Sequence, residues 1–468
     1  MSQNRCSPRL SLPTLDRLGP KILWEGQYPL YIGTYQQAAD PAHQNFTTST
    51  PQSHATRQQF TLAVLACLLL PSPFQHEKDS TSATVENSSK NEDNEDESLP
   101  LDKRLVRSIA RAISPVLQKP NHGPEDLDDN SSTAQQLRAE HAAQCLAAAD
   151  AAFKIFELLA SRDPEVLDTT EVLLTLIAYT NPLEEWTTPN LSVRATLLLQ
   201  QHFDSNPNSK QDLITAHILP TYLRPLFSKS STPSQSSITP SGRPSAYGPN
   251  PDARPSGLPD DSSVTKPWKF VDLRAVTVFE WAVSEADTET TITKSWPLFI
   301  PVLLTLADDN STAIRQRGLV ILQKFLEKFP SRILSDTGLN KVFEDTVLPS
   351  LSYLPSITPE EESVELLGPA YAALRCLAQK LSDANKKNKL LDRVVREGIL
   401  LGYFHAKEYV RIVEVLCREM GELLVQMGVG AVKHLKVRGI VVFVLLNAWT
   451  KGERENKNNA NHANHQIS

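Results

Sequence analysis

Glycine and cysteine are scarce in this sequence, and each scarcity argues against a class of protein. Only 17 of the 468 residues are glycine, which disfavours a β fold rich in glycine turns and a fold that cradles nucleotide phosphates. The five cysteines are widely spaced and include no CxxC pair, so neither a zinc site nor a disulfide framework is indicated. An odd number of scattered cysteines fits a reducing compartment.

Long apolar runs and a basic field are also missing. The longest apolar run, Gly439–Leu446, is far shorter than the roughly 20 residues that a membrane-spanning helix needs. The N-terminus, MSQNRCSPRL, lacks the apolar core of a signal peptide. The net charge is −7, and Glu77–Glu97, with eight acids and two lysines, carries −6 of it. Because the remainder is near neutral, we expect neither nucleic acid nor a membrane as a direct partner.

Recognisable catalytic and cofactor motifs are absent as well. The sequence contains no P-loop, HExxH, GxSxG or kinase catalytic loop, and Gly428-Val429-Gly430 is a lone GxG with no preceding strand. His405 and His434 have no neighbours with metal-ligand spacing. The acidic run Glu360–Glu362 falls in a first helical turn, where negative charge suits the helix dipole. We therefore predict no enzyme activity, no cofactor and no metal.

What the sequence does contain is helical periodicity, interrupted by two segments of different composition. Gln75–Ser98 is acidic and rich in Ser and Asn, and Ser228–Lys266 is dense in Ser, Pro and Gly, so both are predicted to be disordered. Elsewhere apolar residues recur every three or four positions, without convincing strand alternation. The predicted fold is all-α: an α-solenoid of HEAT-like helical repeats with disordered linkers.

The composition shifts divide the chain into six predicted segments. These are an N-terminal helical segment (1–74), an acidic disordered loop (75–98), a helical repeat region (99–227), a Ser/Pro-rich disordered linker (228–266), a C-terminal HEAT-like repeat region (267–436) and an atypical C-terminus (437–468). The expected helices are Tyr28–Ala39, Arg57–Leu70, Leu101–Val116, Ala134–Ser161, Val166–Tyr179, Leu191–Phe203, Leu213–Leu226, Val271–Ser284, Lys294–Leu306, Ala313–Phe329, Leu339–Leu354, Glu360–Leu381, Lys387–Tyr403 and Tyr409–Met427. One helix start is specified further, because Thr358-Pro359-Glu360-Glu361 predicts a capping box with Thr358 at the N-cap.

One stretch, Trp296–Phe325, reads as two short helices with a tight connection. Asp309 lies in the connection, ahead of Arg315 and the small residue Gly318. This order is the pattern of a HEAT repeat, a helix pair that buries its faces only by stacking on neighbours. We expect Asp309 to accept hydrogen bonds from the amides that begin the second helix, and Arg315 to link adjacent repeats. Such a stack is a surface for holding other proteins.

The same half of the chain supplies the candidate residues for repeat structure or partner binding. Large aromatic groups on helix faces belong mostly to the core, with some facing a partner, and the acidic pairs read as structural. The candidates are Trp296, Asp309, Arg315, Arg317, Phe343, Glu344, Asp345, Pro355, Glu360, Glu361 and Tyr371.

Most of the second half resembles the Tel-two-interacting protein two family, as a fungal-type member. The blocks that carry the resemblance are Trp296-Pro297, Leu306–Asp309, Arg315–Leu319, Phe343–Asp345, Leu354-Pro355 and Thr358–Ser363. The first half resembles the family only in its helical character and in the block Arg194–Phe203.

The resemblance implies a non-enzymatic scaffold or adaptor subunit of a TTT-type cochaperone complex. That complex works with the Hsp-ninety machinery to mature and stabilise phosphatidylinositol-3-kinase-related kinases, which serve DNA-damage checkpoint and target-of-rapamycin signalling. The implied partners are the first Tel-two-interacting subunit, bound largely through the C-terminal half, and through it the Tel-two protein. The implied location is the cytoplasm and nucleus. The alternatives are a generic HEAT-repeat scaffold, such as a transport or phosphatase adaptor, and an enzyme with an unrecognised site.

The C-terminus departs from the family pattern. After Lys436-Val437-Arg438-Gly439, the run VVFVLLNAW and a polar tail replace further amphipathic helices. Lys-Val-Arg can be encoded by a sequence that resembles a splice donor, so we expect intron read-through here, with the last repeat or two missing. A native terminal repeat caps a solenoid with a polar outer face. We therefore predict that 437–468 is either poorly packed or an artefact of the gene model.

Overall fold

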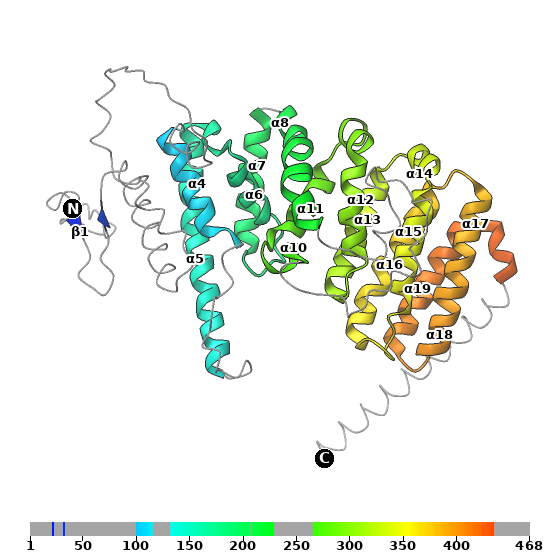
Figure 1. Ribbon diagram of the computed structural model, residues 1–468. Coiled ribbons are helices and arrows are strands. Elements are labelled where there is room, and N and C mark those ends of the chain that lie inside the picture. The colour runs from blue at the N-terminus through cyan, green and yellow to red at the C-terminus, as the bar shows by residue number, and fades with distance from the viewer. Residues whose placement is uncertain are drawn as a thin grey trace, which may run out of the picture. The chain divides into compact units, whose positions relative to one another are not determined.

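The computed structural model describes residues 21–22, 31–32, 100–115, 132–205, 207–228 and 265–434 (Figure 1). The acidic loop, most of the Ser/Pro-rich linker, the helix expected over Arg57–Leu70 and the atypical C-terminus lie outside these ranges. The described chain forms two compact units. Unit 1 comprises Met1–Leu213 with Pro267–Trp281, and unit 2 comprises Ile214–Lys266 with Ala282–Ser468.

Most helices of unit 1 were predicted from the apolar periodicity. The short helices Pro207–Asp212 and Pro267–Phe270 were not, and the helix expected over Val166–Tyr179 is interrupted after Leu167. The elements of the unit are α4 (Leu101–Ile113), α5 (Ser132–Arg162), the 3₁₀ segment η4 (Pro164–Leu167), α6 (Thr170–Ala178), α7 (Pro189–Ser205), α8 (Pro207–Asp212), α10 (Pro267–Phe270) and the start of α11 (Arg274–Glu285). Helix α6 packs against α4 and α7. The core of the unit contains Phe153 and Tyr179, whose rings meet edge to face with centroids 5.3 Å apart, a favourable aromatic geometry.

Unit 2 holds the remaining helices. These are the π-helical η5 (Leu213–Leu223), α9 (Arg224–Phe227), the end of α11, η7 (Thr288–Ile292), α12 (Thr293–Ala307), α13 (Thr312–Lys328), α14 (Ser331–Thr337), α15 (Leu339–Val347), η8 (Leu348–Ser352), α16 (Glu360–Lys380), α17 (Ala384–Arg393), η9 (Val394–Leu400), α18 (Leu401–Ala406), α19 (Val410–Met427) and η10 (Gly428–His434). No helix in the described ranges is both long and apolar enough to cross a bilayer.

Helix pairs stack in two layers within unit 2. Helices α13, α16 and α19 pack successively against one another in one layer, while α12 contacts α15, and η8 contacts η9, in the other (Figure 1). The apolar stripe of each helix therefore finds a cover on the next pair, as a repeat architecture requires. These packed helices confirm the predicted all-α fold class, a solenoid of HEAT-like helical repeats.

The α12–α13 pair shows why this block needs a small residue. A Cβ atom at Gly318 would lie 2.6 Å from the carbonyl carbon of Leu306 and 2.8 Å from the amide nitrogen of Ala307. The two helix backbones thus approach too closely for any side chain at this position. Beside this contact Phe325 stacks on Phe329, with ring centroids 4.9 Å apart, and fills the core between the helices.

Two local predictions are wrong. Helix α16 begins at Glu360 with Pro359 at the N-cap and no side-chain cap hydrogen bond, so Thr358 does not form the predicted capping box. The fixed φ of Pro359 takes the extended conformation before the helix, which leaves Thr358 one position too early. Tyr31–Ile32 forms a two-residue antiparallel ladder with Lys21–Ile22 rather than helix, which suits an aromatic and a β-branched residue.

One predicted helix is longer and less regular than expected. The segment expected over Lys387–Tyr403 begins earlier, with α17 at Ala384, because Asp383 caps it by accepting hydrogen bonds from the amides of Asn385 and Lys386. It continues without a break through the π-helical η9 into α18. Gly398 lies in η9, where a Cβ would come within 2.8 Å of both Leu351 and the Tyr371 hydroxyl.

Candidate functional site

The connection between α12 and α13 centres on the buried carboxylate of Asp309, which is 1% exposed. Its Oδ1 accepts a hydrogen bond from the amide of Ser311 (2.9 Å), the residue before α13, and its Oδ2 accepts one from Lys266 Nζ (2.6 Å). A buried carboxylate is stable only when paired and hydrogen-bonded. Asp309 therefore fastens Lys266, the last residue of the first segment of unit 2, to the start of α13.

Arg315 extends this network to the next helix pair. It is 3% exposed, donates from Nε to the Asp309 carbonyl (2.9 Å) and from Nη1 to Ser350 Oγ in η8 (3.3 Å), and lies 4.6 Å from the ring centroid of Tyr353. Cation–π and hydrogen-bond contacts of this kind hold a guanidinium in one orientation. Its burial makes Arg315 a link within the structure and leaves little of it for a partner to contact.

The aromatic candidates lie in the core or at its edge. Phe343 and Tyr371 are fully buried, while Trp296 is half-buried with its ring centroid 6.3 Å from that of Phe329. Pro355 is half-buried. The Tyr371 hydroxyl has no hydrogen-bond partner in the described part of the chain, and burial raises the pKa of this phenol. These residues stabilise the stack.

The charged candidates lie nearer to solvent and form ion pairs both between helices and within α15. Glu344, on α15, accepts from Arg393 Nη1 (2.7 Å), and Asp345 pairs with Lys341 (2.8 Å). The hydrogen bond to Glu344 raises the pKa of the Arg393 guanidinium. Partial burial acts to lower the pKa of Lys341, but its hydrogen bond to Asp345 and the charge of Glu344 raise it overall.

The remaining candidates lie on α13 and at the start of α16. Glu361 is exposed and pairs with Arg411 of α19 across 3.3 Å. Glu360 and Arg317 are half-buried. Glu362, which the sequence placed in the acidic first turn but not among the candidates, accepts a hydrogen bond from the Thr312 hydroxyl at the start of α13. The first turn of α16 therefore joins its neighbours through side chains rather than through a capping box.

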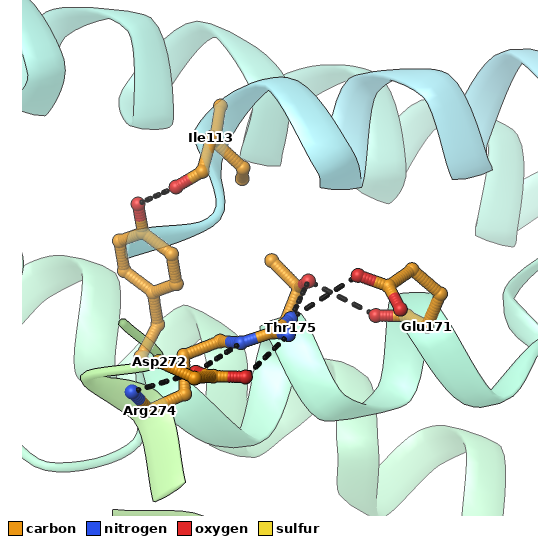
Figure 2. Close-up of polar contacts among 6 residues, drawn as sticks. Ile113, Glu171, Thr175, Asp272 and Arg274 are labelled. Carbon is orange, nitrogen blue, oxygen red and sulfur yellow. Dashed lines mark hydrogen bonds and ion pairs between the residues drawn. The ribbon is translucent and has the colours of Figure 1, made fainter. Parts of the chain in front are cut away.

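Unit 1 contains a buried polar cluster that sequence reasoning missed (Figure 2). Arg274 donates to both carboxylate oxygens of Asp272 (3.1 Å each) and, from Nη1, to Glu171 (3.2 Å) and to the Thr175 hydroxyl (3.4 Å). Beside it, the Tyr179 hydroxyl donates to the Ile113 carbonyl (2.8 Å). Asp272 precedes α11 by two residues, which is a weak cap signal. The partners of Arg274 on α6 lie about a hundred positions away in sequence and could not be inferred from it.

Catalytic and metal-binding arrangements do not emerge from these clusters. In the described ranges no three His, Cys, Asp or Glu side chains gather as they would to hold a metal ion. The clusters of Asp309 and Arg274 consist of fully paired charges that connect helices. Their chemistry is that of structural cross-links.

An exposed apolar surface lies where α18 meets α19. It is formed by Leu401, Phe404, Tyr409 and Val410, which we call the α18–α19 apolar surface; Phe404 is 70% exposed. Large apolar groups gathered on the outside of a soluble protein indicate a contact surface for another chain. Sequence reasoning missed these residues, because a helical apolar pattern does not say which of its members a neighbour covers.

Comparison with known proteins supports the resemblance seen in the sequence. No solved structure matches the chain. The model of the Tti2 family matches residues 172–446. This region takes in the candidate residues, the α18–α19 apolar surface and the first ten residues after Lys436. Because the match covers more than half of the sequence, this chain belongs to the Tti2 family.

Proposed function

We propose that this chain is a non-enzymatic scaffold subunit that supports the maturation and stability of phosphatidylinositol-3-kinase-related kinases. Membership of the Tti2 family implies the general role of a TTT complex subunit. The family consists of cochaperone scaffold subunits and is not a known enzyme family. The finer proposal is that the chain binds the first Tel-two-interacting subunit and, through it, the Tel-two protein. Its clients would then serve DNA-damage and target-of-rapamycin signalling, in the cytoplasm and nucleus.

The α18–α19 apolar surface is the observation that carries the binding part of this proposal. It lies within the region that the family shares, on two helices that pack against each other, of which α19 also packs against α16. Buried aromatic anchors supply much of the free energy of protein association. Phe404 is the most exposed side chain of this surface and is the anchor that we expect.

Copurification tests the proposal. The full chain is expected to retain the first Tel-two-interacting subunit, and Phe404→Ala is expected to weaken retention by about 2 kcal/mol, as truncation of an interface anchor does. Leu183→Ser is the matched control, because Leu183 is 89% exposed and lies in unit 1. Equal retention by wild type and Phe404→Ala would show that the α18–α19 apolar surface is not part of the interface.

The alternative is a generic helical-repeat adaptor. Recovery of transport or phosphatase subunits with the full chain, without either Tel-two-associated protein, would favour that alternative. Depletion of the chain from cells is expected to lower the levels of the kinases. Unchanged kinase levels would show that a TTT subunit role does not extend to kinase maturation. Tagging the chain with a fluorescent protein tests the proposed location.

A further inference from the structure

The first half of α17 carries lysines for which the fold provides no partner. The helix, ANKKNKLLDR, has four basic residues and one acid, so its formal charge is 4 − 1 = +3. Lys386 and Lys389 are exposed and Lys387 is half-buried. Within the described ranges, none of the three side chains forms an ion pair or hydrogen bond. The sequence predicted a helix here but no role for its lysines.

Other cations of the same region are paired. Arg393 lies on the same face as Lys386 and Lys389, since residues three, four and seven positions apart share a helix face. It donates to Glu344 (2.7 Å) and to Glu397 (2.9 Å). The contrast shows that α17 is joined to its neighbours through Arg393 at its C-terminal end, while its N-terminal lysines make no such connection.

The lysines also stand at the unfavourable end of the helix. Positive charge near a helix N-terminus opposes the helix dipole by about 0.3–1 kcal/mol, and α17 has no acidic residue in its first turn. Its first amides are already satisfied by the Asp383 side chain. The lysines therefore do not stabilise α17, and an anionic ligand would offset both their mutual repulsion and the dipole.

We infer that the lysine face of α17, formed by Lys386 and Lys389 with Lys387 beside it, binds an acidic, extended segment of a partner protein. An ammonium group attracts carboxylates as a point charge, without the planar geometry that a guanidinium imposes, so the face selects charge rather than one sequence. The whole chain carries −7 and its overall field does not favour an acidic ligand. The attraction is local, within the Debye length of about 8 Å at physiological salt.

Binding of a labelled synthetic peptide of glutamate and serine to the full chain, followed by fluorescence anisotropy, tests this inference. A peptide with glutamine in place of glutamate is the control ligand. We expect the glutamate peptide to bind, the glutamine peptide not to bind, and added salt to weaken binding. The variant Lys386→Glu/Lys389→Glu should weaken binding by about tenfold or more, since like charges then face each other.

The matched control is Lys294→Glu/Lys407→Glu. Both lysines are exposed, and neither forms an ion pair or hydrogen bond within the described ranges. This variant has the same change in net charge and should bind the glutamate peptide like wild type. Should the α17 reversal disturb folding, as circular dichroism would show, Lys386→Gln/Lys389→Gln removes the same charges with less perturbation and should also weaken binding.

Four results would overturn the inference. Unchanged peptide binding by the folded α17 variants would show that the lysine face is not the binding site. An equal loss of binding in the Lys294/Lys407 control would show that only the net charge of the chain matters. The peptide could also bind only after the acids of Glu77–Glu97 are replaced by their amides. That result would show that this chain's own acidic run, and not a partner, occupies the lysine face. A DNA duplex that displaced the peptide through the same lysines would assign it to nucleic acid.

Discussion

Individual residues hold this protein together through buried charges whose partners come from distant positions. Lys266 and Asp309 are 43 positions apart, and their side chains meet at 2.6 Å in a buried setting. Removing one partner leaves the other charged and unsolvated, whereas removing both leaves a neutral site. The consequence of substitution therefore depends on whether one or both members of the pair are changed.

A double-mutant cycle measures this coupling. Lys266→Met and Asp309→Asn are each expected to destabilise unit 2 by about 3–5 kcal/mol, and the double variant is expected to cost clearly less than their sum. Urea unfolding of the three variants gives the free energies. Strict additivity would show that the two side chains are not coupled.

Gly318 and Gly421 provide opposite predictions for the same substitution. Gly318→Ala places a Cβ 2.6 Å from backbone of α12 and should destabilise the chain by about 1–3 kcal/mol. Gly421 lies inside α19 with open space around its Cβ position, so Gly421→Ala should stabilise by up to about 1 kcal/mol. Thermal unfolding midpoints that moved in the same direction would contradict the close approach of α12 and α13.

Cys376 should resist alkylation in the folded chain. Burial, followed by the nearby charge of Glu327, raises the pKa of its thiol to about 11. The raised pKa keeps the thiol protonated through neutral and mildly alkaline pH, and only the thiolate reacts. We expect iodoacetamide to modify half-buried Cys145 well before Cys376 at pH 8, as read by mass spectrometry of the peptides. Equal rates would show that the Cys376 environment opens readily.

At the scale of elements, helix starts depend on capping residues that the local pattern identifies only in part. Asp383 caps α17 by accepting from two amides, whereas Thr358 does not cap α16 because Pro359 takes the N-cap position. Removal of the Asp383 side chain should therefore weaken α17. Removal of the Thr358 side chain would weaken α16 only if the predicted capping box existed.

Substitution of the two residues separates these claims. Asp383→Ala should cost about 1 kcal/mol, the usual value of an N-cap side chain, and should speed hydrogen exchange at the first amides of α17. Thr358→Ala should leave exchange at the first amides of α16 unchanged, because no cap hydrogen bond is lost. Faster hydrogen exchange at the first amides of α16 after Thr358→Ala would show that Thr358 does cap this helix.

At the scale of the whole molecule, the C-terminus is the least typical part of the sequence. The apolar run of Val437–Trp449 leads us to expect that a chain truncated after Met427 aggregates less than the full chain, as measured by light scattering. Equal solubility would refute that prediction. Read-through after Lys436 stays a prediction, which sequencing of the mature transcript tests.

The sequence by itself determined the all-α class, the positions of most helices and the family. Helical periodicity is a local property, so α12, α13, α16 and α19 lie within two or three residues of their predicted bounds. The need for a small residue at Gly318 and for polar groups at Asp309 and Arg315 was likewise readable from one repeat. These features belong to single helix pairs and depend on few distant contacts.

The tertiary structure alone decided which charges pair and which apolar residues stay exposed. Lys266 with Asp309 and Arg274 with Glu171 join positions far apart in sequence, and no local pattern encodes such partners. The exposure of Phe404 follows from what neighbouring helices cover. The lack of a side-chain ion pair for Lys386 and Lys389, within the part of the chain that the structure describes, follows from which acids those helices bring near. Both proposed binding surfaces therefore became visible only after the helices were packed.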